Sequence, residues 1–384
     1  MRSLSRVDVA VRWTRRAGLL LGALALAACS SDKGPKPAKL TAISHPIAIH
    51  RSWTVDIGSA GAAYLRPCVL PQSVYAASAS GDLVRVDPTN GKTVWRVRVP
   101  GGIAAGVGCD GVSEAVVGRR GALRLYDAAG TLRWKSDHAG TVAVTPPLLA
   151  HSMVVVRTID QRVTAYDEDS GNRLWSFRKT PPPLSLRGES ELALAGDLAI
   201  IGFPRGQLVA VALANGAPRW EAAVSEPKGL TEVERLNDVL GMPAVDGADV
   251  CAESYQGRIT CFDTYTGELR WARNFDADAG VAMDADMVIG VRENGDVDAF
   301  SRDAGAGIWH NGTLSYRGLT APAIVGHWAA VGDFAGEVHF LRRDDGRVVG
   351  RFDARSPLAS SPQAWNDGII IQTVAGKLSL LNPR

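Results

Sequence analysis

The sequence predicts an all-β fold, an eight-bladed β-propeller in which each blade is a four-stranded antiparallel sheet. The first observation is a frame of Asp, Gly and Trp at constant spacing, present in VRVDPTNGKTVW, VTAYDEDSGNRLW and ITCFDTYTGELRW. The frame returns about every forty residues, which is the length of one propeller blade. The second observation is that each copy, such as IIIQTVAGKLSLL, contains short apolar runs joined by a Gly-containing turn, the pattern of β-hairpins.

Eight copies of the repeat can be aligned. The turn glycine before one strand of each copy falls at Gly81, Gly121, Gly206, Gly257, Gly295, Gly336 and Gly376, and Gln161 takes its place in the third copy. The Trp positions are Trp53, Trp95, Trp134, Trp175, Trp220, Trp271 and Trp309, with Gly350 in the seventh copy. The chain ends before the eighth copy reaches a Trp, whereas Trp53 precedes the first full copy at the usual spacing. We therefore expect the N-terminal strand to complete the last blade and close the ring without an exposed sheet edge.

Each residue of the frame has a structural explanation. The second Gly permits the positive φ of a tight turn, and the Asp can bond to the backbone of that turn. The Trp ring can be buried between adjacent blades, because a single sheet cannot cover its own faces. A row of aromatic rings that stacks on a ligand would need one common surface. Recurrence at a fixed place in the repeat predicts a girdle of rings instead.

The N-terminus has the pattern of an export signal. Several arginines precede a short apolar run from Ala17 to Ala28, too short for a permanent membrane span. Leu26-Ala27-Ala28-Cys29 resembles a bacterial lipobox, which implies lipidation of Cys29. An ordinary signal peptide with an incidental Cys is the alternative.

We therefore predict a signal peptide at residues 1–28, an acylated Cys with a flexible tether at 29–45, and the propeller at 46–384. Ser30 follows the Cys where an Asp would resemble an inner-membrane retention signal, which favours the outer membrane. The formal net charge of +2 includes the arginines of the signal segment. A nearly neutral mature chain argues against nucleic acid as a partner.

Four cysteines remain after Cys29, namely Cys68, Cys109, Cys251 and Cys261. An exported protein can oxidise them. Cys251 and Cys261 are expected on neighbouring strands of one hairpin, but whether they face each other depends on a register that the sequence leaves open. Neither a Cys251–Cys261 nor a Cys68–Cys109 disulfide is decided at this level. No cysteine or histidine spacing suggests zinc.

The frame A-x-D-x-x-x-G-x-x-x-W resembles the docking motif of enzymes that use pyrroloquinoline quinone (PQQ), which would imply a periplasmic PQQ-dependent dehydrogenase. The chain lacks the vicinal Cys pair and the calcium-binding loops of those enzymes. Asp276 and Asp278 begin like a calcium loop, but no Glu closes it, and a solvated inter-strand turn over 276–287 is our interpretation. We predict no catalytic, cofactor-binding or metal-binding residues and hence no enzyme. A PQQ enzyme, or a glycan- or peptide-binding propeller that uses its axial channel, is the alternative.

Two neighbouring connections of the repeat are longer than the rest, from Trp175 to Gly206 and from Trp220 to Gly257. Both lead from the outer strand of one blade to the inner strand of the next, so both should emerge on the same face of the ring. Their apolar residues, beside Arg187 and several carboxylates, are Leu184, Leu186, Leu230, Val233, Leu236 and Val239. Such a mixture is typical of protein contacts. The alternative is that these side chains fill the gap between blades.

The lipobox, the eight PQQ-like repeats, PPLSLRGES and TEVERLNDV together resemble the BamB family, the lipoprotein of the outer-membrane β-barrel assembly machinery. The resemblance implies a non-enzymatic scaffold on the periplasmic face of the outer membrane, held to the membrane only by its lipid anchor. Its implied partners are the POTRA domains of the central, BamA-like barrel protein and unfolded outer-membrane protein substrates. The family contacts carry over to Leu184, Leu186, Arg187 and Asp238, whereas Leu240 stands where the family has a second acid.

Overall fold

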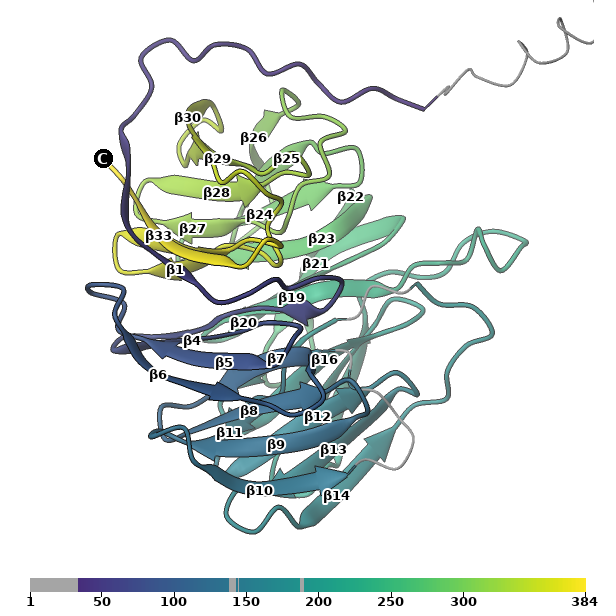
Figure 1. Cartoon of the computed structure of the whole chain (residues 1–384). Coiled ribbons are helices and arrows are strands. Elements are labelled where there is room, and N and C mark those ends of the chain that lie inside the picture. Colours follow the sequence, from purple (N-terminus) through teal and green to yellow (C-terminus); the bar gives the residue numbers. More distant parts are fainter. Residues whose placement is uncertain (1–33, 138–142, 144, 187–189) are drawn as a thin grey trace, which may run out of the picture. The chain divides into compact units, whose positions relative to one another are not determined.

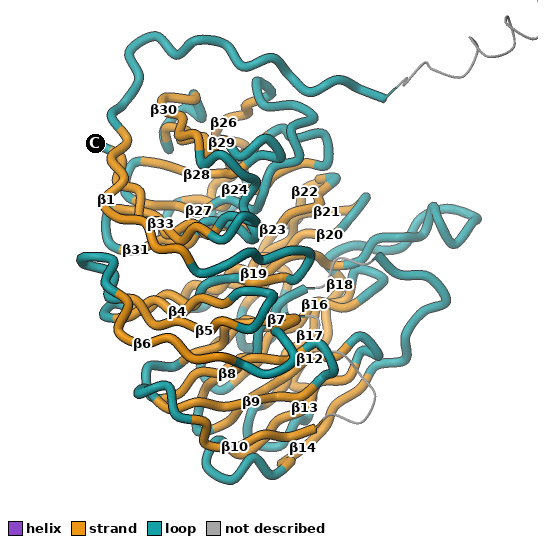
Figure 2. The backbone as a smooth tube through the Cα atoms, in the orientation of Figure 1, coloured by secondary structure: helices purple, strands orange, loops and turns teal. Residues whose placement is uncertain are grey.

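The structure is a computed structural model that describes residues 34–137, 143, 145–186 and 190–384. Residues Ala38–Arg384 form one compact unit, which consists of strands and loops (Figures 1 and 2). Within the described residues, no helix has the length and apolar character needed to cross a bilayer. The predicted signal segment 1–28 and Cys29 lie outside the described residues.

The strands form eight sheets, numbered here as blades 1 to 8 in chain order. Blades 1 to 4 contain β3 (Cys68–Leu70), β4 (Ser73–Ala77), β5 (Asp82–Val86) and β6 (Thr93–Arg98); β7 (Ile103–Cys109), β8 (Ser113–Gly118), β9 (Ala122–Asp127) and β10 (Leu132–Asp137); β11 (Leu148–Ala150), β12 (Met153–Thr158), β13 (Arg162–Asp167) and β14 (Arg173–Arg178); β15 (Leu192–Ala195), β16 (Leu198–Phe203), β17 (Gln207–Ala212) and β18 (Pro218–Ala223).

Blades 5 to 7 contain β19 (Val239–Asp246), β20 (Asp249–Ser254), β21 (Gly257–Asp263) and β22 (Leu269–Phe275); β23 (Ala277–Met283), β24 (Met287–Arg292), β25 (Val297–Ser301) and β26 (Gly307–Asn311); β27 (Ala323–Val325), β28 (Trp328–Gly332), β29 (Glu337–Arg342) and β30 (Val348–Asp353). Blade 8 combines β31 (Gln363–Trp365), β32 (Gly368–Gln372) and β33 (Lys377–Pro383) with β1 (Ile49–Asp56).

The blades form a closed ring around an axis. The first strand of each blade contacts the first strand of the next, from β3 through β7, β11, β15, β19, β23 and β27 to β31, and β31 contacts β3. A separate cluster of buried apolar side chains lies at each of the eight junctions between blades. The predicted eight-bladed propeller is therefore confirmed.

The last blade is completed from the other end of the chain. β1 pairs antiparallel with β33, with Trp53 opposite Leu380 and Asp56 opposite Lys377. Figure 1 shows the purple N-terminal strand beside the yellow C-terminal one. The expectation from Trp53 that the two ends share a blade is confirmed.

The blades are held to one another by the Trp residues of the repeat. Each indole N–H donates to a backbone carbonyl of the turn between the third and fourth strands of the next blade. The acceptors for Trp53, Trp95, Trp134, Trp175, Trp220, Trp271 and Trp309 are, in that order, Pro88, Ala128, Glu168, Leu213, Thr264, Arg302 and Arg343, at 2.6–2.9 Å.

The second Gly of the repeat receives the Trp ring of the preceding blade. Gly267 has a φ of +73°, and a Cβ at this position would lie 2.7 Å from the ring of Trp220. Gly91 meets Trp53 in the same way, with 2.6 Å between the added Cβ and the indole. Glycine is therefore required twice, for the positive φ of the turn and for the close approach of the indole.

The junction between blades 7 and 8 explains why Gly350 replaces a Trp. Blade 8 has no turn between its third and fourth strands, because β33 and β1 are the two ends of the chain. A Cβ on Gly350 would lie 2.8 Å from Ile47 and 2.9 Å from Ile49, so these side chains occupy the place of the indole. The repeat with Gly350 in place of a Trp is thus the one whose neighbouring blade has no turn between its third and fourth strands to accept an indole N–H.

Three features differ from the sequence-based expectation or were absent from it. β2 (Tyr64–Leu65) adds to blade 2 as a fifth strand, parallel to β7. The expected solvated turn over 276–287 is wrong for most of its length, because 277–283 is the first strand of blade 6. Ala38, within the predicted tether, accepts a hydrogen bond from Arg317 and donates one to the carbonyl of Ser315.

Both cysteine pairs are disulfides. Cys68 and Cys109 join the first strands of blades 1 and 2, with 6.1 Å between their Cα atoms. Cys251 and Cys261 lie directly opposite each other on β20 and β21. The structure thus fixes the strand register that the sequence left open.

Candidate protein-docking surface

The two long connections emerge on one face of the ring. The first runs from the end of β14 to the start of β15, and the second from the end of β18 to the start of β19. Each therefore leaves the fourth strand of one blade and enters the first strand of the next. The end of the first connection meets β19, just after the second connection, because Ser190 and Gly241 form a parallel bridge and the N–H of Glu191 donates to the carbonyl of Gly241 at 3.0 Å.

The buried side chain of Asp238, in the second connection, holds the first connection by a hydrogen bond. It is only 4% exposed. One carboxylate oxygen accepts the N–H of Leu186 at 2.7 Å, and the other accepts the N–H of Arg205 at 3.2 Å. Burial raises the pKa of Asp238, while these two backbone hydrogen bonds act in the opposite direction. The predicted contact residue thus supports the loop that carries Leu186.

A buried guanidinium group fixes the far end of the first connection. Arg157 is 1% exposed, lies over the ring of Phe203 at 5.0 Å, and donates to the carbonyl of Ser190 at 2.6 Å. It also donates to the side chain of Gln161 at 2.7 Å. Gln161 occupies the turn-glycine position with a φ of +60°, so the one repeat without that glycine supplies an anchor for the long connection.

The second connection presents apolar side chains to solvent. Leu230 is 99% exposed and Val233 is 64% exposed. Glu234 holds this turn in shape, because its carboxylate accepts the N–H groups of Leu230 and Thr231 at 2.8 and 3.0 Å. These hydrogen bonds lower the pKa of Glu234. A fully exposed leucine on a hydrogen-bonded turn is an apolar group held where a partner could cover it.

The sequence-predicted residues divide into an exposed set and a buried set. Leu184 is 41% exposed and Leu186 is half-buried. Val239 packs in the core between blades 4 and 5, and Leu240 is also buried. For Val239, the interpretation as filling between blades therefore applies. Arg187 lies outside the described residues.

We define the docking surface as Leu184, Leu186, Leu230 and Val233, supported by Asp238. Arg205 lies beside it, with 3.9 Å between its guanidinium group and the carboxylate of Glu232. A groove of about 320 Å³ adjoins the first connection and is lined by Pro181, Pro182, Pro183 and Phe203 among others. Exposed apolar groups beside a proline-lined groove and an arginine are suited to contact with another protein.

The axial region of the ring is crossed by side chains that bond to one another. Tyr64 donates to Glu191 at 2.7 Å, and Arg66 pairs with the same carboxylate at 2.8 Å. Arg66 also donates to Gln363 at 3.0 Å. Charged groups that already satisfy one another leave little to recognise a glycan or peptide. Among the described residues, no cluster of His, Cys, Asp and Glu is arranged to hold a metal ion.

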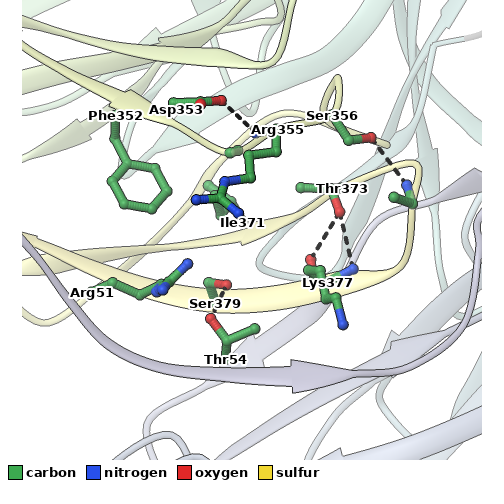
Figure 3. Close-up of a pocket in the computed structure, with 12 residues that line it drawn as sticks. Arg51, Thr54, Phe352, Asp353, Arg355, Ser356, Ile371, Thr373, Lys377 and Ser379 are labelled. Atoms are coloured by element: carbon green, nitrogen blue, oxygen red, sulfur yellow. Dashed lines mark hydrogen bonds between the residues drawn. The ribbon is translucent and has the colours of Figure 1, made fainter.

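A separate cavity of about 280 Å³ lies between blades 7 and 8 (Figure 3). Its hydroxyl groups bond to one another or to the backbone, as Ser379 does to Thr54 at 2.7 Å. Arg51 and Arg355 line it together with Asp353, and the ammonium group of Lys377 donates to Asp56 at 2.7 Å. The cavity therefore carries mixed charge, and none of its hydroxyls is aligned with a general base.

Comparison with known proteins agrees with this geometry. A profile of the family described as "Outer membrane protein assembly factor BamB" matches residues 79–311 and 293–384. A relative of the same name from Bordetella pertussis is 37% identical over 373 residues, covering 96% of this chain and 96% of the relative. A second, from Burkholderia pseudomallei, is 36% identical over 365 residues, covering 94% and 96%.

Solved structures give the same result. The crystal structure of BamB from Moraxella catarrhalis is 29% identical, with a TM-score of 0.80, covering 87% of this chain and 100% of that one. A quinohemoprotein alcohol dehydrogenase from Comamonas testosteroni is 11% identical, with a TM-score of 0.66, covering 87% and 76%. At that identity the enzyme shares the fold alone.

Proposed function

The chain belongs to the BamB family of outer membrane protein assembly factors, and on that premise we propose that it is a lipid-anchored scaffold on the periplasmic face of the outer membrane. It docks on the POTRA domains of the central barrel protein through the docking surface and Arg187. Bound there, it assists the folding and insertion of β-barrel proteins. Acyl chains on Cys29 hold it to the membrane.

The observation that carries this proposal is the joining of the two long connections by Asp238. A loop that must bind a partner loses conformational entropy on binding, and hydrogen bonds that hold it beforehand reduce that loss. Leu186 is fixed by Asp238, and Leu230 by Glu234. Leu186 and the exposed Leu230 are thus preorganised, and Arg187 follows directly after Leu186 in the sequence.

The proposal is tested by co-purification with the central barrel protein. We expect Leu184→Asp and Arg187→Glu each to reduce the amount of barrel protein recovered by at least about tenfold, as for the central residues of an interface. Isolated POTRA domains should show the same loss of affinity.

A matched control exists on the opposite face of the ring. Val112 is 65% exposed in the turn between β7 and β8, so Val112→Asp places the same charge on an apolar position that is more accessible than Leu184. We expect it to leave co-purification unchanged. Normal recovery with Leu184→Asp and Arg187→Glu, in chains that keep the thermal midpoint of the wild type, would contradict the docking surface.

A further inference from the structure

A basic cavity lies on the same face of the ring as the docking surface, but between blades 1 and 2. It encloses about 630 Å³ and is lined by Pro100, Gly101, Gly118, Arg119, Arg120, Ala122, Arg124 and Lys135. Four of these residues are basic and none is acidic. The docking surface, by contrast, lies at the junctions of blades 3 with 4 and 4 with 5.

The guanidinium groups of Arg119, Arg120 and Arg124 form no ion pair with a carboxylate among the described residues. Arginine stays protonated at every accessible pH. Elsewhere on this protein, arginines are paired with carboxylates, as Arg98 at the end of β6 is with Asp82 at 2.9 Å. The three arginine charges, gathered in one concavity without a paired carboxylate, repel one another and attract an anion.

Arg124 provides a second, independent observation. Its Nη1 atom is buried and has no hydrogen-bond partner, although a buried donor without a partner costs free energy. Arg124 lies on β9, opposite Val116 of β8 and Lys135 of β10. The buried nitrogen therefore has a donor to offer to a ligand that enters from the cavity.

Glycines make room for the arginine side chains. A Cβ on Gly118 would lie 2.9 Å from Nη1 of Arg124, and one on Gly102 would lie 3.2 Å from Nε of Arg119. Gly101 and Gly102 have φ values of +85° and +78°, a conformation that side chains rarely adopt. The absence of side chains at these glycines thus leaves space for the guanidinium groups.

From these observations we propose that the cavity between blades 1 and 2 binds a phosphate group through Arg119, Arg120 and Arg124. Planar guanidinium groups match phosphate oxygens with paired hydrogen bonds. The cavity has the size of a small-ligand site, too small for a folded partner. The phosphate belongs either to a free phosphorylated compound or to the headgroup of an anionic lipid, and both are the same chemistry at the site.

The test uses the full chain and two probes, inorganic phosphate measured by calorimetry and vesicles of phosphatidylglycerol compared with phosphatidylcholine. We expect the double variant Arg119→Gln, Arg124→Gln to bind phosphate at least roughly tenfold more weakly, since a single charge-assisted hydrogen bond already contributes about that factor. Because part of Arg124 is buried, the exposed pair Arg119→Gln, Arg120→Gln serves as a second variant. Thermal unfolding verifies that both variants are folded.

The matched control is Arg51→Gln, Arg355→Gln in the cavity of Figure 3, which removes the same charge from a site that also contains Asp353. It should retain phosphate binding. Loss of phosphate binding only in the first two variants supports a site for a free compound, and loss of phosphatidylglycerol binding in them supports a lipid source. The same N-terminal segment is present in every variant, so differences between variants report on the cavity.

Three results would overturn the proposal. One is the absence of any binding by the wild type at millimolar phosphate and to both kinds of vesicle. Another is an equal loss in the control variant, which would indicate unspecific attraction to positive charge. The third is tighter binding of a polyglutamate peptide than of phosphate, abolished by the same substitutions, which would assign the cavity to an acidic protein segment. None of these outcomes depends on the central barrel protein.

Discussion

The carboxylate of Asp238 accepts the backbone N–H of Leu186 across 52 residues of sequence, at 2.7 Å. The second oxygen of the same carboxylate accepts the N–H of Arg205. The acidic residue that the family resemblance assigns to partner contact is thus the support of the neighbouring loop. Its effect on a partner would be exerted through the position of Leu186.

Replacement of Asp238 should therefore loosen the loop more than it changes the surface. In Asp238→Ala, two partly buried N–H groups lose their acceptor, at a cost of about 1–3 kcal/mol. We expect faster hydrogen exchange at the amides of Leu186 and Arg205 and weaker binding of POTRA domains. Asp238→Asn should behave similarly, because its amide NH₂ would face one of the two donors. Unchanged exchange at both amides would refute the supporting role, and Asp303→Ala, at an exposed turn, is the control.

Glu114 should make stability depend on pH. Its side chain is fully buried beside the hydroxyl group of Tyr75, and burial raises its pKa to about 8 from 4.5, while the Tyr75 hydroxyl and the charge of Arg85 act in the opposite direction. The folded state therefore holds a proton that the unfolded state releases between these values, so stability falls as pH rises through that window. Since one pKa unit corresponds to about 1.4 kcal/mol, the decline should be on the order of a few kcal/mol.

Glu114→Gln removes this titration. We expect its thermal midpoint to vary less than that of the wild type between about pH 5 and pH 8 and to exceed it at the alkaline end. For Asp333, the dependence of stability on pH has the opposite sign. Burial acts to raise its pKa, but hydrogen bonds from His339, the Glu337 amide and Arg317 lower it from 3.8 to about 2. Its contribution to the free energy of unfolding is therefore lost only as pH falls through that range. Parallel pH profiles for Glu114→Gln and the wild type would contradict the assignment.

The docking of Trp220 on Gly267 can be measured with a matched pair of glycines. In Gly267→Ala, strain at positive φ adds to a clash with the indole, and we expect a loss of ~2–4 kcal/mol in the free energy of unfolding. Gly247 has a similar φ of +59°, but nothing lies within 4 Å of an added Cβ. Gly247→Ala should therefore cost only about 1–2 kcal/mol. Equal losses would show that the indole contributes nothing to the requirement for glycine.

The two disulfides should differ in their contribution to stability. Cys68–Cys109 closes a segment with a separation of 41 residues and joins two blades, whereas Cys251–Cys261 spans 10 residues within one hairpin. Loss of a disulfide releases more entropy in the unfolded chain when its loop is longer, by about 1 kcal/mol for this ratio. Denaturation of Cys68→Ala/Cys109→Ala and Cys251→Ala/Cys261→Ala chains compares them. A larger loss in the second variant would be the contrary result.

The sequence predicts the fold well because the repeat is periodic and Trp53 lies one period before the first full copy. Strand content, blade number and the shared last blade all follow from that period. The replacement of a Trp by Gly350 does not follow from the period, since it depends on which blade lacks a turn between its third and fourth strands. Over 276–287, the run of aspartates suggested a turn, but 277–283 forms β23, where pairing with β24 outweighs local composition.

The candidate site is less accessible to sequence reasoning. The length of the two connections identifies their common face, and the exposure of Leu184 and Leu230 agrees with an apolar contact. The sequence gives no sign that Asp238 points inward, because a buried carboxylate that accepts backbone N–H groups looks like any other acid in a loop. A Gln in a glycine position was a usable signal, since Gln161 bonds to Arg157.

The pairing of β1 with β33 also has a consequence for biosynthesis. Ribosomes extend a chain from its N-terminus, so the fourth strand of blade 8 is made before any other blade and its three companions are made last. Trp53 can dock on Pro88 as soon as blade 1 has formed, so blade 1 can hold β1 before the partner strands of β1 are made. Every nascent chain nevertheless has an incomplete blade 8 until β31, β32 and β33 have been made, and an unpaired strand edge is prone to pair with another chain in that interval.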